Sequence, residues 1–227
     1  MSAQARLTRT SRIDDTTNNL AVHERSHPDM KKSSRANAAR WKSEAFAKAK
    51  RVAPRQAIRI GSTPATRFRG DAAIFGRLVE DHDRHRALFS MIEASERTSP
   101  DRGKLFRELV HEIKGHAAAE EQALWSTVLR HPESTDAGRH AVAEHKKIDD
   151  MFADLAARNM KLPGWLRRFG AAKKLYLHHI REEEQEQFVE SQKVLTLADQ
   201  RYMHGVFNRR KREEKAKARV TPKIRLK

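Results

Sequence analysis

The feature that most restricts the fold of this chain is an internal repeat with an offset of 63 residues. Histidines and glutamates recur at this offset, and so do apolar positions such as Phe106 and Phe169. The two histidines of each half are 34 residues apart. The recurring polar positions, given as pairs, are His82 and His145, His116 and His179, and the triplets 120–122 and 183–185. The two halves therefore read as two copies of one helical hairpin.

From Asp71 onward, apolar residues recur at steps of three and four, which is the spacing of one helix face. Four such runs are separated by short segments that contain Pro100, Pro132 and Pro163, and proline does not continue a helix comfortably. Short connections between long helices make neighbouring helices antiparallel. We therefore predict an all-α chain: an up-down-up-down antiparallel four-helix bundle, followed by a short additional C-terminal helix within 195–218. The apolar residues expected to dock this last helix are Leu197, Tyr202, Met203 and Phe207.

The position of the histidines relative to the turns predicts that they meet at one level of the bundle. Residues at equal distances from the turn of an antiparallel hairpin lie at the same height, and the midpoint of each histidine pair falls beside Pro100 or Pro163. The recurring residues lie roughly 20–25 Å from their turns, at a rise of about 1.5 Å per residue. The residues expected at this level are His82, His116, Glu120, His145, His179 and Glu183.

This cluster has a structural and a functional interpretation. A single core histidine is usually just a hydrogen-bonded core residue, but four histidines with two carboxylates make a poor core unless a metal ion holds them. The chain has no cysteine, which excludes disulfides and thiolate ligands. Histidine and carboxylate ligands suit a borderline transition metal rather than calcium or magnesium. The two-fold repetition predicts two metal ions bridged by carboxylates.

Four stretches together resemble the hemerythrin-like (HHE cation-binding) domain of bacteria: LVEDHDRHRALF, HAAAEEQALW, AEHKKIDDMF and HHIREEEQEQF. The resemblance covers about residues 71–207. It implies a four-helix bundle that holds two non-heme iron ions with an oxo or hydroxo bridge. It also implies roles in oxygen binding or sensing, in iron handling, or in the response to peroxide and nitric oxide. The implied iron ligands are the six residues named above, with Glu120 and Glu183 as the bridges.

One position departs from the oxygen-carrying hemerythrins. They place a further histidine one turn after the third-helix histidine, where this chain has Asp149. This departure puts reversible oxygen carriage in doubt and leaves sensing, iron storage and peroxide turnover open. His178 with Glu182 is a competing ligand pair, but the register of the repeat favours His179 and Glu183. His85 is interpreted as a core residue or as one that supports a ligand, and the coordination by Asp149, His178 and His85 stays open. The histidines interpreted as surface or packing residues are His111, His131, His140 and His204.

The net charge of +17 is concentrated at the two ends of the chain. Residues 1–70 carry a net charge of +11 and residues 208–227 a net charge of +8, whereas residues 71–207 carry −2. We predict a disordered basic extension over 1–70, the bundle over 71–207 and a basic tail over 208–227. Such tails would bind nucleic acid in a salt-dependent, sequence-independent way. Solvated ends without a partner are the alternative that we favour, because no nucleic-acid recognition motif is evident.

Three functions compete at this point. The first is a non-heme di-iron protein that senses or buffers oxygen, reactive oxygen or nitrogen species or iron, with dioxygen, peroxide or nitric oxide as the small ligand. The second is a nucleic-acid-associated protein whose bundle senses, and the third is an enzyme that degrades peroxide or reduces nitric oxide. The chain shows neither an apolar run of about 18 residues nor a secretory signal, so a cytoplasmic location is expected.

Overall fold

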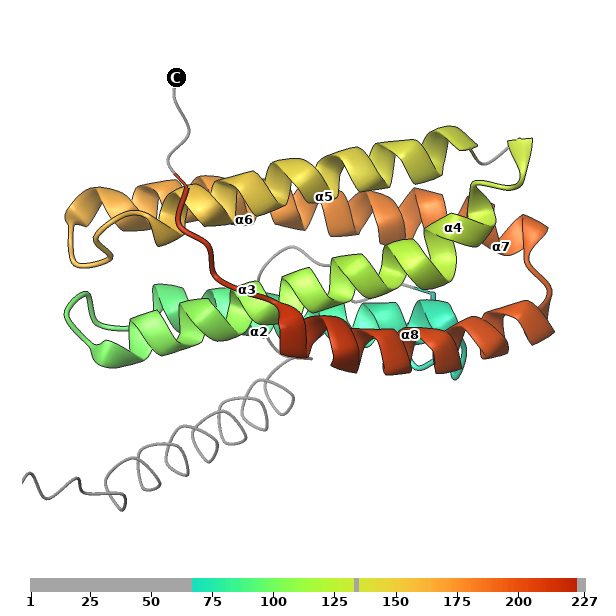
Figure 1. Cartoon of the computed structure of the whole chain (residues 1–227), viewed down its shortest axis with the longest axis horizontal. Helices are drawn as coiled ribbons and strands as arrows, with labels where there is room; N and C mark the ends of the chain where they lie inside the picture. The colour runs from blue at the N-terminus through green and yellow to red at the C-terminus, as the bar shows by residue number, and fades with distance from the viewer. Residues whose placement is uncertain (1–66, 133–134, 224–227) are drawn as a thin grey trace, which may run out of the picture. The chain divides into compact units, whose positions relative to one another are not determined.

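The structure is a computed structural model that describes residues 67–132 and 135–223. These residues form helices and connecting turns and contain no strand, which confirms the predicted all-α class. The long helices of this part of the chain are α2 (Ile74–Glu93), α3 (Pro100–Glu120), α5 (Thr135–Ala156), α6 (Pro163–Glu182) and α8 (Leu197–Lys217) (Figure 1). The shorter ones are α4 (Ser126–Val128), α7 (Phe188–Val194) and two π-helical turns, η1 (Glu121–Trp125) and η3 (Glu183–Gln187). The disorder predicted for 1–70 concerns residues that lie almost wholly outside the described part.

Proline marks the breaks between the long helices, as the sequence predicted. Pro100 and Pro163 are the first residues of α3 and α6. Proline lacks a backbone N–H group, and at this position such a group would have no hydrogen-bond partner within the helix. Ser99 caps α3, because its hydroxyl accepts a hydrogen bond of 3.1 Å from the backbone N–H of Asp101. Pro132 lies in the break before α5. Figure 1 shows α2 beside α3 and α5 beside α6, each pair joined by a short turn.

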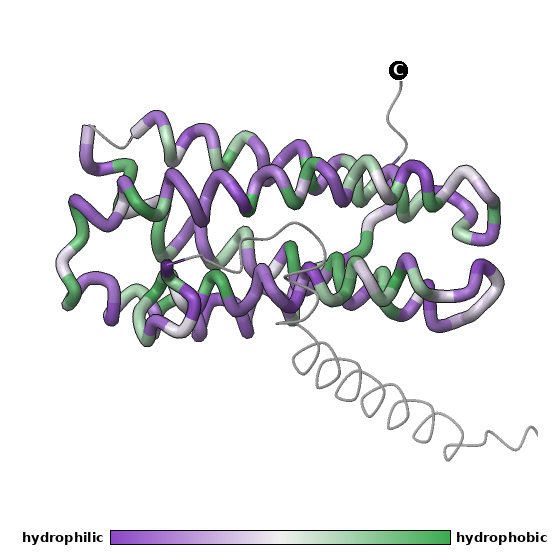
Figure 2. Tube along the Cα trace, turned by 180° about the vertical axis from the view of Figure 1, so that it is seen from behind, coloured by the Kyte–Doolittle hydropathy of each residue, from purple (hydrophilic) through white to green (hydrophobic). Residues whose placement is uncertain are grey.

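A polar band lies between two apolar clusters along the long helices. One cluster has the aromatic members Phe89, Phe106, Phe152, Trp165, Phe169 and Tyr176. The other has the aromatic members Phe68, Phe75, Trp125, Phe188 and Phe207. On α2, the buried His82 lies between Val79 of the second cluster and Ala87 of the first, and the same arrangement recurs on α3 and α5. Figure 2 shows how hydrophobic and hydrophilic residues alternate along each long helix.

Both helices that carry a predicted glutamate ligand change to a π-helical turn at that glutamate. Turn η1 begins directly after Glu120, and η3 begins at Glu183. The sequence pattern predicted an ordinary α-helix for both stretches. A π-helical turn inserts one extra residue into the helix, and such turns are frequent at functional sites. Their recurrence at repeat-related positions shows that the repeat extends to the backbone conformation.

Helix α8 confirms the helix predicted within 195–218, although with 21 residues it is as long as the helices of the bundle rather than short. It packs against α2, α3 and η1. Met203 and Phe207 are buried there, as predicted. Leu197 and Tyr202 are 54% and 74% exposed, so the prediction that they dock the helix is wrong.

The helix also extends into the region predicted to be a solvated tail. It begins with a capping box in which the side chains of Thr196 and Asp199 each accept a hydrogen bond from the other's backbone N–H. It ends at Lys217, so residues 208–217 are helical, and the side chain of Lys211 is buried. The predicted boundary between bundle and tail therefore falls inside α8, whereas the domain limits themselves stay predictions.

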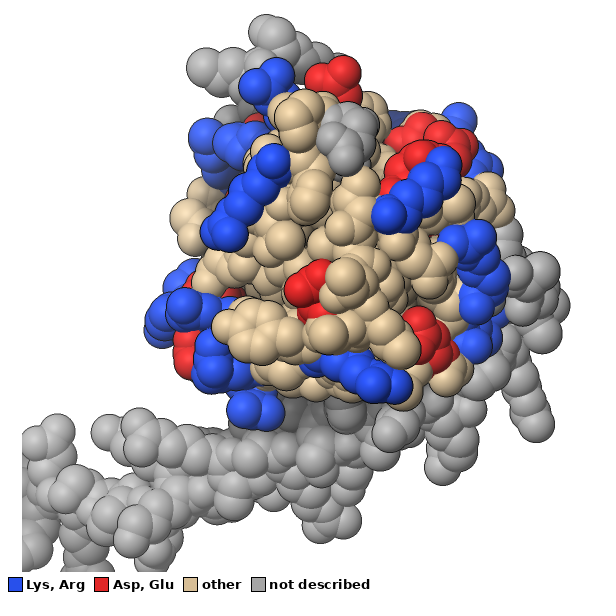
Figure 3. Space-filling view, turned by 90° about the vertical axis from the view of Figure 1, so that its right-hand side faces the viewer, with Lys and Arg blue, Asp and Glu red and all other residues tan. Residues whose placement is uncertain are grey.

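Basic side chains are spread over the end of the bundle where α4, α7 and the start of α8 lie. Figure 3 views this end and shows Lys and Arg around its rim rather than gathered in one patch. Over 67–132 and 135–223, no helix is both long enough and apolar enough to cross a membrane.

Candidate metal centre

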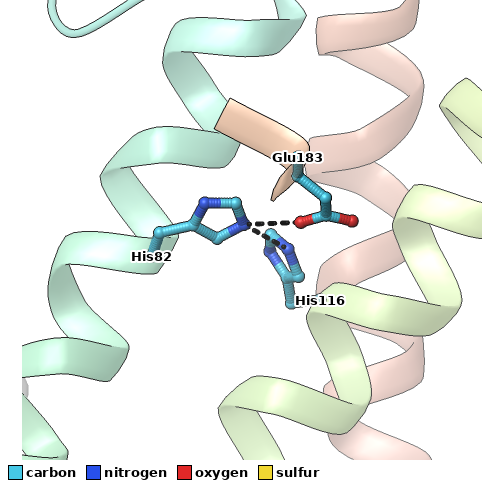
Figure 4. Close-up of side chains that lie close together, drawn as sticks. All are labelled: His82, His116 and Glu183. Carbon is cyan, nitrogen blue, oxygen red and sulfur yellow. Dashed lines mark hydrogen bonds and ion pairs between the residues drawn. The ribbon is translucent and has the colours of Figure 1, made fainter. Parts of the chain in front are cut away.

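The four predicted histidines come from four different helices and are all buried: His82 on α2, His116 on α3, His145 on α5 and His179 on α6. Their Nε2 atoms point toward two glutamates. Figure 4 shows one half of the cluster, where His82 Nε2 lies 3.2 Å from His116 Nε2 and 3.4 Å from Glu183 Oε2. The structure thus brings together residues that span more than 100 positions of the chain.

Glu183 lies between the two histidine pairs. Its Oε2 faces His82, whereas its Oε1 is 3.3 Å from His179 Nε2 and 3.9 Å from His145 Nε2. Glu183 therefore groups with the first pair through one oxygen and with the second pair through the other. Glu183 thus offers one carboxylate oxygen to each of the two histidine pairs.

Glu120 makes the equivalent connection from α3. Its Oε2 lies 3.7 Å from His116 Nε2 and 3.5 Å from His145 Nε2, so it also reaches both halves of the cluster. These separations are close to the roughly 3.4 Å between neighbouring ligand atoms that each bind one ion at about 2.1 Å in tetrahedral geometry.

Each histidine is also held from the outside by a carboxylate at its other ring nitrogen. The Nδ1 atoms of His82 and His145 lie 2.9 Å from Glu184 and 2.8 Å from Glu121. Those two glutamates are 63 positions apart. An imidazole that donates Nδ1–H to a carboxylate presents the lone pair of Nε2 to the centre, which is the form that binds a metal.

The other two histidines follow the same rule within their own hairpins. His116 Nδ1 lies 3.2 Å from Asp81 Oδ2, and His179 Nδ1 lies 3.0 Å from Glu144 Oε2. Asp81 and Glu144 are again 63 positions apart, each directly before the first histidine of its repeat. These outer carboxylates were not predicted from the sequence, although an acidic residue directly before His82 and His145 in both copies of the repeat indicated them.

The two central glutamates lack hydrogen bonds altogether within the described part of the chain. All four carboxylate oxygens of Glu120 and Glu183 are buried without a hydrogen-bond partner there, and so is Nε2 of His145. Nearly all buried polar atoms of folded proteins have such a partner. Four carboxylate oxygens and one imidazole nitrogen without partners at ligand spacing fit a metal site, because bound cations would satisfy them.

The negative charges of Glu120 and Glu183 repel each other, and this repulsion separates the pKa values of the two carboxyl groups. Burial raises the pKa of Glu183 well above its usual value, and the negative charges of Glu120 and Glu184 raise it further. Burial also acts to raise the pKa of Glu120, but the neighbouring imidazoles of His145 and His116 outweigh it and lower the pKa. Only one carboxylate of such a pair can ionise readily without a cation, and cations at this place would let both do so.

The histidines have unequal proton affinities. Burial lowers the pKa of His116 and of His179 to about 4, although Asp81 and Glu144 act against it. For His145, burial also favours the neutral form, but the carboxylates of Glu120 and Glu121 outweigh it and raise the pKa to about 9. His116 and His179 are therefore neutral at pH 7, the state that a metal ligand needs.

Of the three residues whose coordination was left open, His85 lies beside the cluster, with its ring centroid 5.2 Å from that of His116, whereas Asp149 and His178 form ion pairs outside it. The carboxylate of Asp149 is 44% exposed and lies 2.7 Å from Lys114 Nζ. His85 is buried, and its Nδ1 contacts the hydroxyl of Tyr176. His178 is about half exposed, and its Nε2 faces Glu182 instead of the centre.

A pocket of about 360 Å³ connects the centre with the surface between α3 and α5. Its inner wall includes the three histidines His116, His145 and His179, and Lys114 and Asp149 lie toward the outside. Its exposed lining is more apolar than polar, so it suits a small, weakly polar molecule.

Comparison with known proteins places this geometry in a family. The chain shares its fold with the crystal structure of a hemerythrin HHE cation binding domain-containing protein from Mycobacterium kansasii, with a TM-score of 0.58 and 21% sequence identity. The match covers 64% of this chain and 89% of that chain. A search of curated proteins produced no match. The family model described as the hemerythrin HHE cation binding domain matches residues 73–189, which contain the whole cluster. The chain therefore belongs to the hemerythrin HHE cation-binding domain family.

Proposed function

We propose that this protein binds two non-heme iron ions in an up-down-up-down four-helix bundle and uses them to sense or buffer oxygen, reactive oxygen or nitrogen species, or iron. The observation that supports the proposal most strongly is the set of four orphaned carboxylate oxygens of Glu120 and Glu183 among four inward-facing imidazoles. Two bound cations would coordinate the oxygens that lack hydrogen-bond partners, and they would offset the repulsion between the negative charges of Glu120 and Glu183.

The proposed ligands form two half-sites. His82 and His116 would hold one ion, His145 and His179 would hold the other, and Glu120 and Glu183 would be shared. Iron fits a set of imidazole and carboxylate donors without sulfur. When bound, a pair of iron ions supplies reversible redox chemistry toward small oxygen and nitrogen species.

The other residues of this chain orient the site and control access to it. The outer carboxylates hold the four imidazoles with Nε2 inward, which reduces the reorganisation needed for binding. The pocket beside His145 admits a small molecule from the surface between α3 and α5. Because Asp149 points to Lys114 near the outside of this pocket, we propose sensing or buffering rather than reversible oxygen carriage.

Metal analysis of the purified protein tests the proposal. We expect about two iron ions per chain, and loss of iron in His116→Ala and Glu120→Ala, because each change removes a donor that no neighbour replaces. His131→Ala, on the exposed side of the break before α5, is the matched control and keeps its iron. Fewer than one iron ion per chain after expression with added iron, or full iron content in His116→Ala, would contradict the proposal.

The pocket supports peroxide turnover as a second candidate activity. It gives a molecule of that size a path to His145, and an open coordination position at a two-metal site permits such chemistry. An assay of peroxide consumption by the iron-loaded protein separates a catalyst from a sensor. The nucleic-acid partner and the cytoplasmic location stay predictions, since most of the basic extensions lie outside the described residues.

A further inference from the structure

A second group of metal-binding side chains lies on the outer face of α5 and α6. His140 and Glu144 are one turn apart on α5, and Glu182 approaches them from α6. One ligand atom from each of the three lies within 4.8 Å of the other two. We propose that His140, Glu144 and Glu182 form a surface-accessible site for a divalent transition-metal ion, separate from the buried centre.

The spacing of the donor atoms fits one ion. His140 Nε2 lies 3.4 Å from Glu182 Oε2 and 3.6 Å from Glu144 Oε2. Ligands that bind one ion at about 2.0–2.1 Å in tetrahedral geometry are separated by roughly 3.4 Å, so binding requires only small side-chain movements. The side chain of His140 is 53% exposed, which leaves the remaining coordination position to water.

The carboxylate of Glu182 is held in place by a neighbour that contacts the oxygen facing away from the proposed ion. His178 Nε2 lies 3.3 Å from Glu182 Oε1, and Arg181 donates a hydrogen bond of 3.0 Å to His178 Nδ1. Since Nδ1 accepts, Nε2 carries the proton and binds Glu182 Oε1, so that Oε2 is left facing His140. Outer contacts of this kind orient the ligands of metal sites.

Glu144 connects this outer site to the buried centre. Its Oε2 accepts the Nδ1–H group of His179 at 3.0 Å, and its side chain is only 5% exposed, so its position is fixed by the interior. The donor set of one imidazole and two carboxylates carries two negative charges. It suits ferrous, zinc or cobalt ions better than calcium or magnesium, which prefer oxygen ligands alone.

Calorimetric titration of the full-length protein with Zn²⁺ tests the outer site. The metal already bound is measured first, and Zn²⁺ uptake is compared between wild type and variants of equal metal content, so that a difference reports on the outer site and not on the buried centre. We expect one Zn²⁺ site that is lost in His140→Ala and in Glu182→Gln. His178→Ala, which removes the orienting contact, is expected to weaken the same site about tenfold.

His131→Ala is the matched control, because it removes a partly exposed histidine that contributes to neither cluster. Alanine suits an exposed position in a helix, so His140→Ala is expected to fold, and circular dichroism checks this. If His140 only formed ion pairs with the two glutamates, wild type and His140→Ala would take up the same amount of Zn²⁺. That result, or the absence of Zn²⁺ uptake by the wild type, would overturn the proposal.

Discussion

At the scale of single residues, the carboxylates outside the histidines decide what the cluster can bind. In a buried imidazole, the hydrogen bond made by one ring nitrogen fixes which nitrogen carries the proton and which one is free to bind a metal ion. Glu121 and Glu184 make that bond to His145 and His82, but their surroundings differ. Glu121 is partly exposed, whereas Glu184 is buried and also pairs with Arg86 at 2.9 Å.

This difference leads to a prediction for a matched pair of variants. Glu121→Gln is expected to weaken iron binding by about 10- to 100-fold with little change in the free energy of unfolding, because it removes only the charge that supports His145. Glu184→Gln is expected to weaken iron binding similarly and to lower stability as well, because Arg86 loses a buried charged partner. Competition with a chelator and thermal unfolding measure the two effects. Equal stability of the two variants would contradict this account.

At the scale of elements, helix α8 is joined to the bundle by more than apolar contacts. Gly115 allows close approach of α3 and α8, since a Cβ atom there would lie 2.8 Å from Lys215 Cβ. Lys211 Nζ lies between the buried carboxylates of Asp81 and Glu112, at 2.5 and 2.7 Å. Burial acts to raise the pKa of Asp81, but Lys211 and His116 outweigh it and hold the pKa well below its usual value. Through Asp81, α8 therefore supports a histidine of the centre.

We expect Lys211→Met to be strongly destabilising. It keeps most of the aliphatic length of the side chain but removes the cation that Asp81 and Glu112 share, leaving Asp81 with Arg77 and Arg84 and Glu112 with Lys215. Because these partners remain, the cost is expected to reach at most about 3–5 kcal/mol, which is that of a broken buried pair. The control is Lys217→Met near the end of the same helix, where the exposed ion pair with Glu214 is expected to contribute under about 1 kcal/mol. Urea denaturation of both variants measures the difference. If they unfold at the same urea concentration, α8 does not depend on Lys211.

At the scale of the whole molecule, two apolar clusters enclose a polar band. Several buried carboxylate oxygens of this band have no hydrogen-bond partner within the described residues unless metal ions bind them. The unmatched charges of this band should make the stability of the metal-free protein sensitive to pH. The histidines act in opposite directions, because His116 and His179 have lowered pKa values while that of His145 is raised.

The metal-free protein is expected to be most stable near pH 6.5. Below this pH, the unfolded chain takes up protons that His116 and His179 do not accept in the folded state until about pH 4, so stability falls. The raised pKa of Glu183 offsets part of this loss. Above pH 6.5, the stability contributed by protonated His145 is lost progressively up to about pH 9. Thermal unfolding of chelator-treated protein from pH 4.5 to pH 9 checks this, and a steady rise of the melting temperature across the range would contradict it.

Much of the fold could be predicted from the sequence, because it depends on local rules. Helical spacing of apolar residues and the prolines at positions 100 and 163 predicted where α3 and α6 begin. The repeat predicted that six polar residues would gather, and they do. The role of α8 was harder to predict, since Lys211 and Lys215 resemble any other residues of a basic tail until the acidic residues on α3 are placed beside them.

The main helices of the bundle, the two-fold repeat and the height at which the histidines meet could all be predicted from the sequence, because they follow from spacing along the chain. The direction in which each imidazole faces, and the oxygens that remain without partners, depend on tertiary contacts. The physical reason is that His145 depends on Glu121 across a turn, and His82 depends on Glu184 from a helix about 100 residues away. Such contacts are set by packing between helices, which the spacing within one helix does not determine.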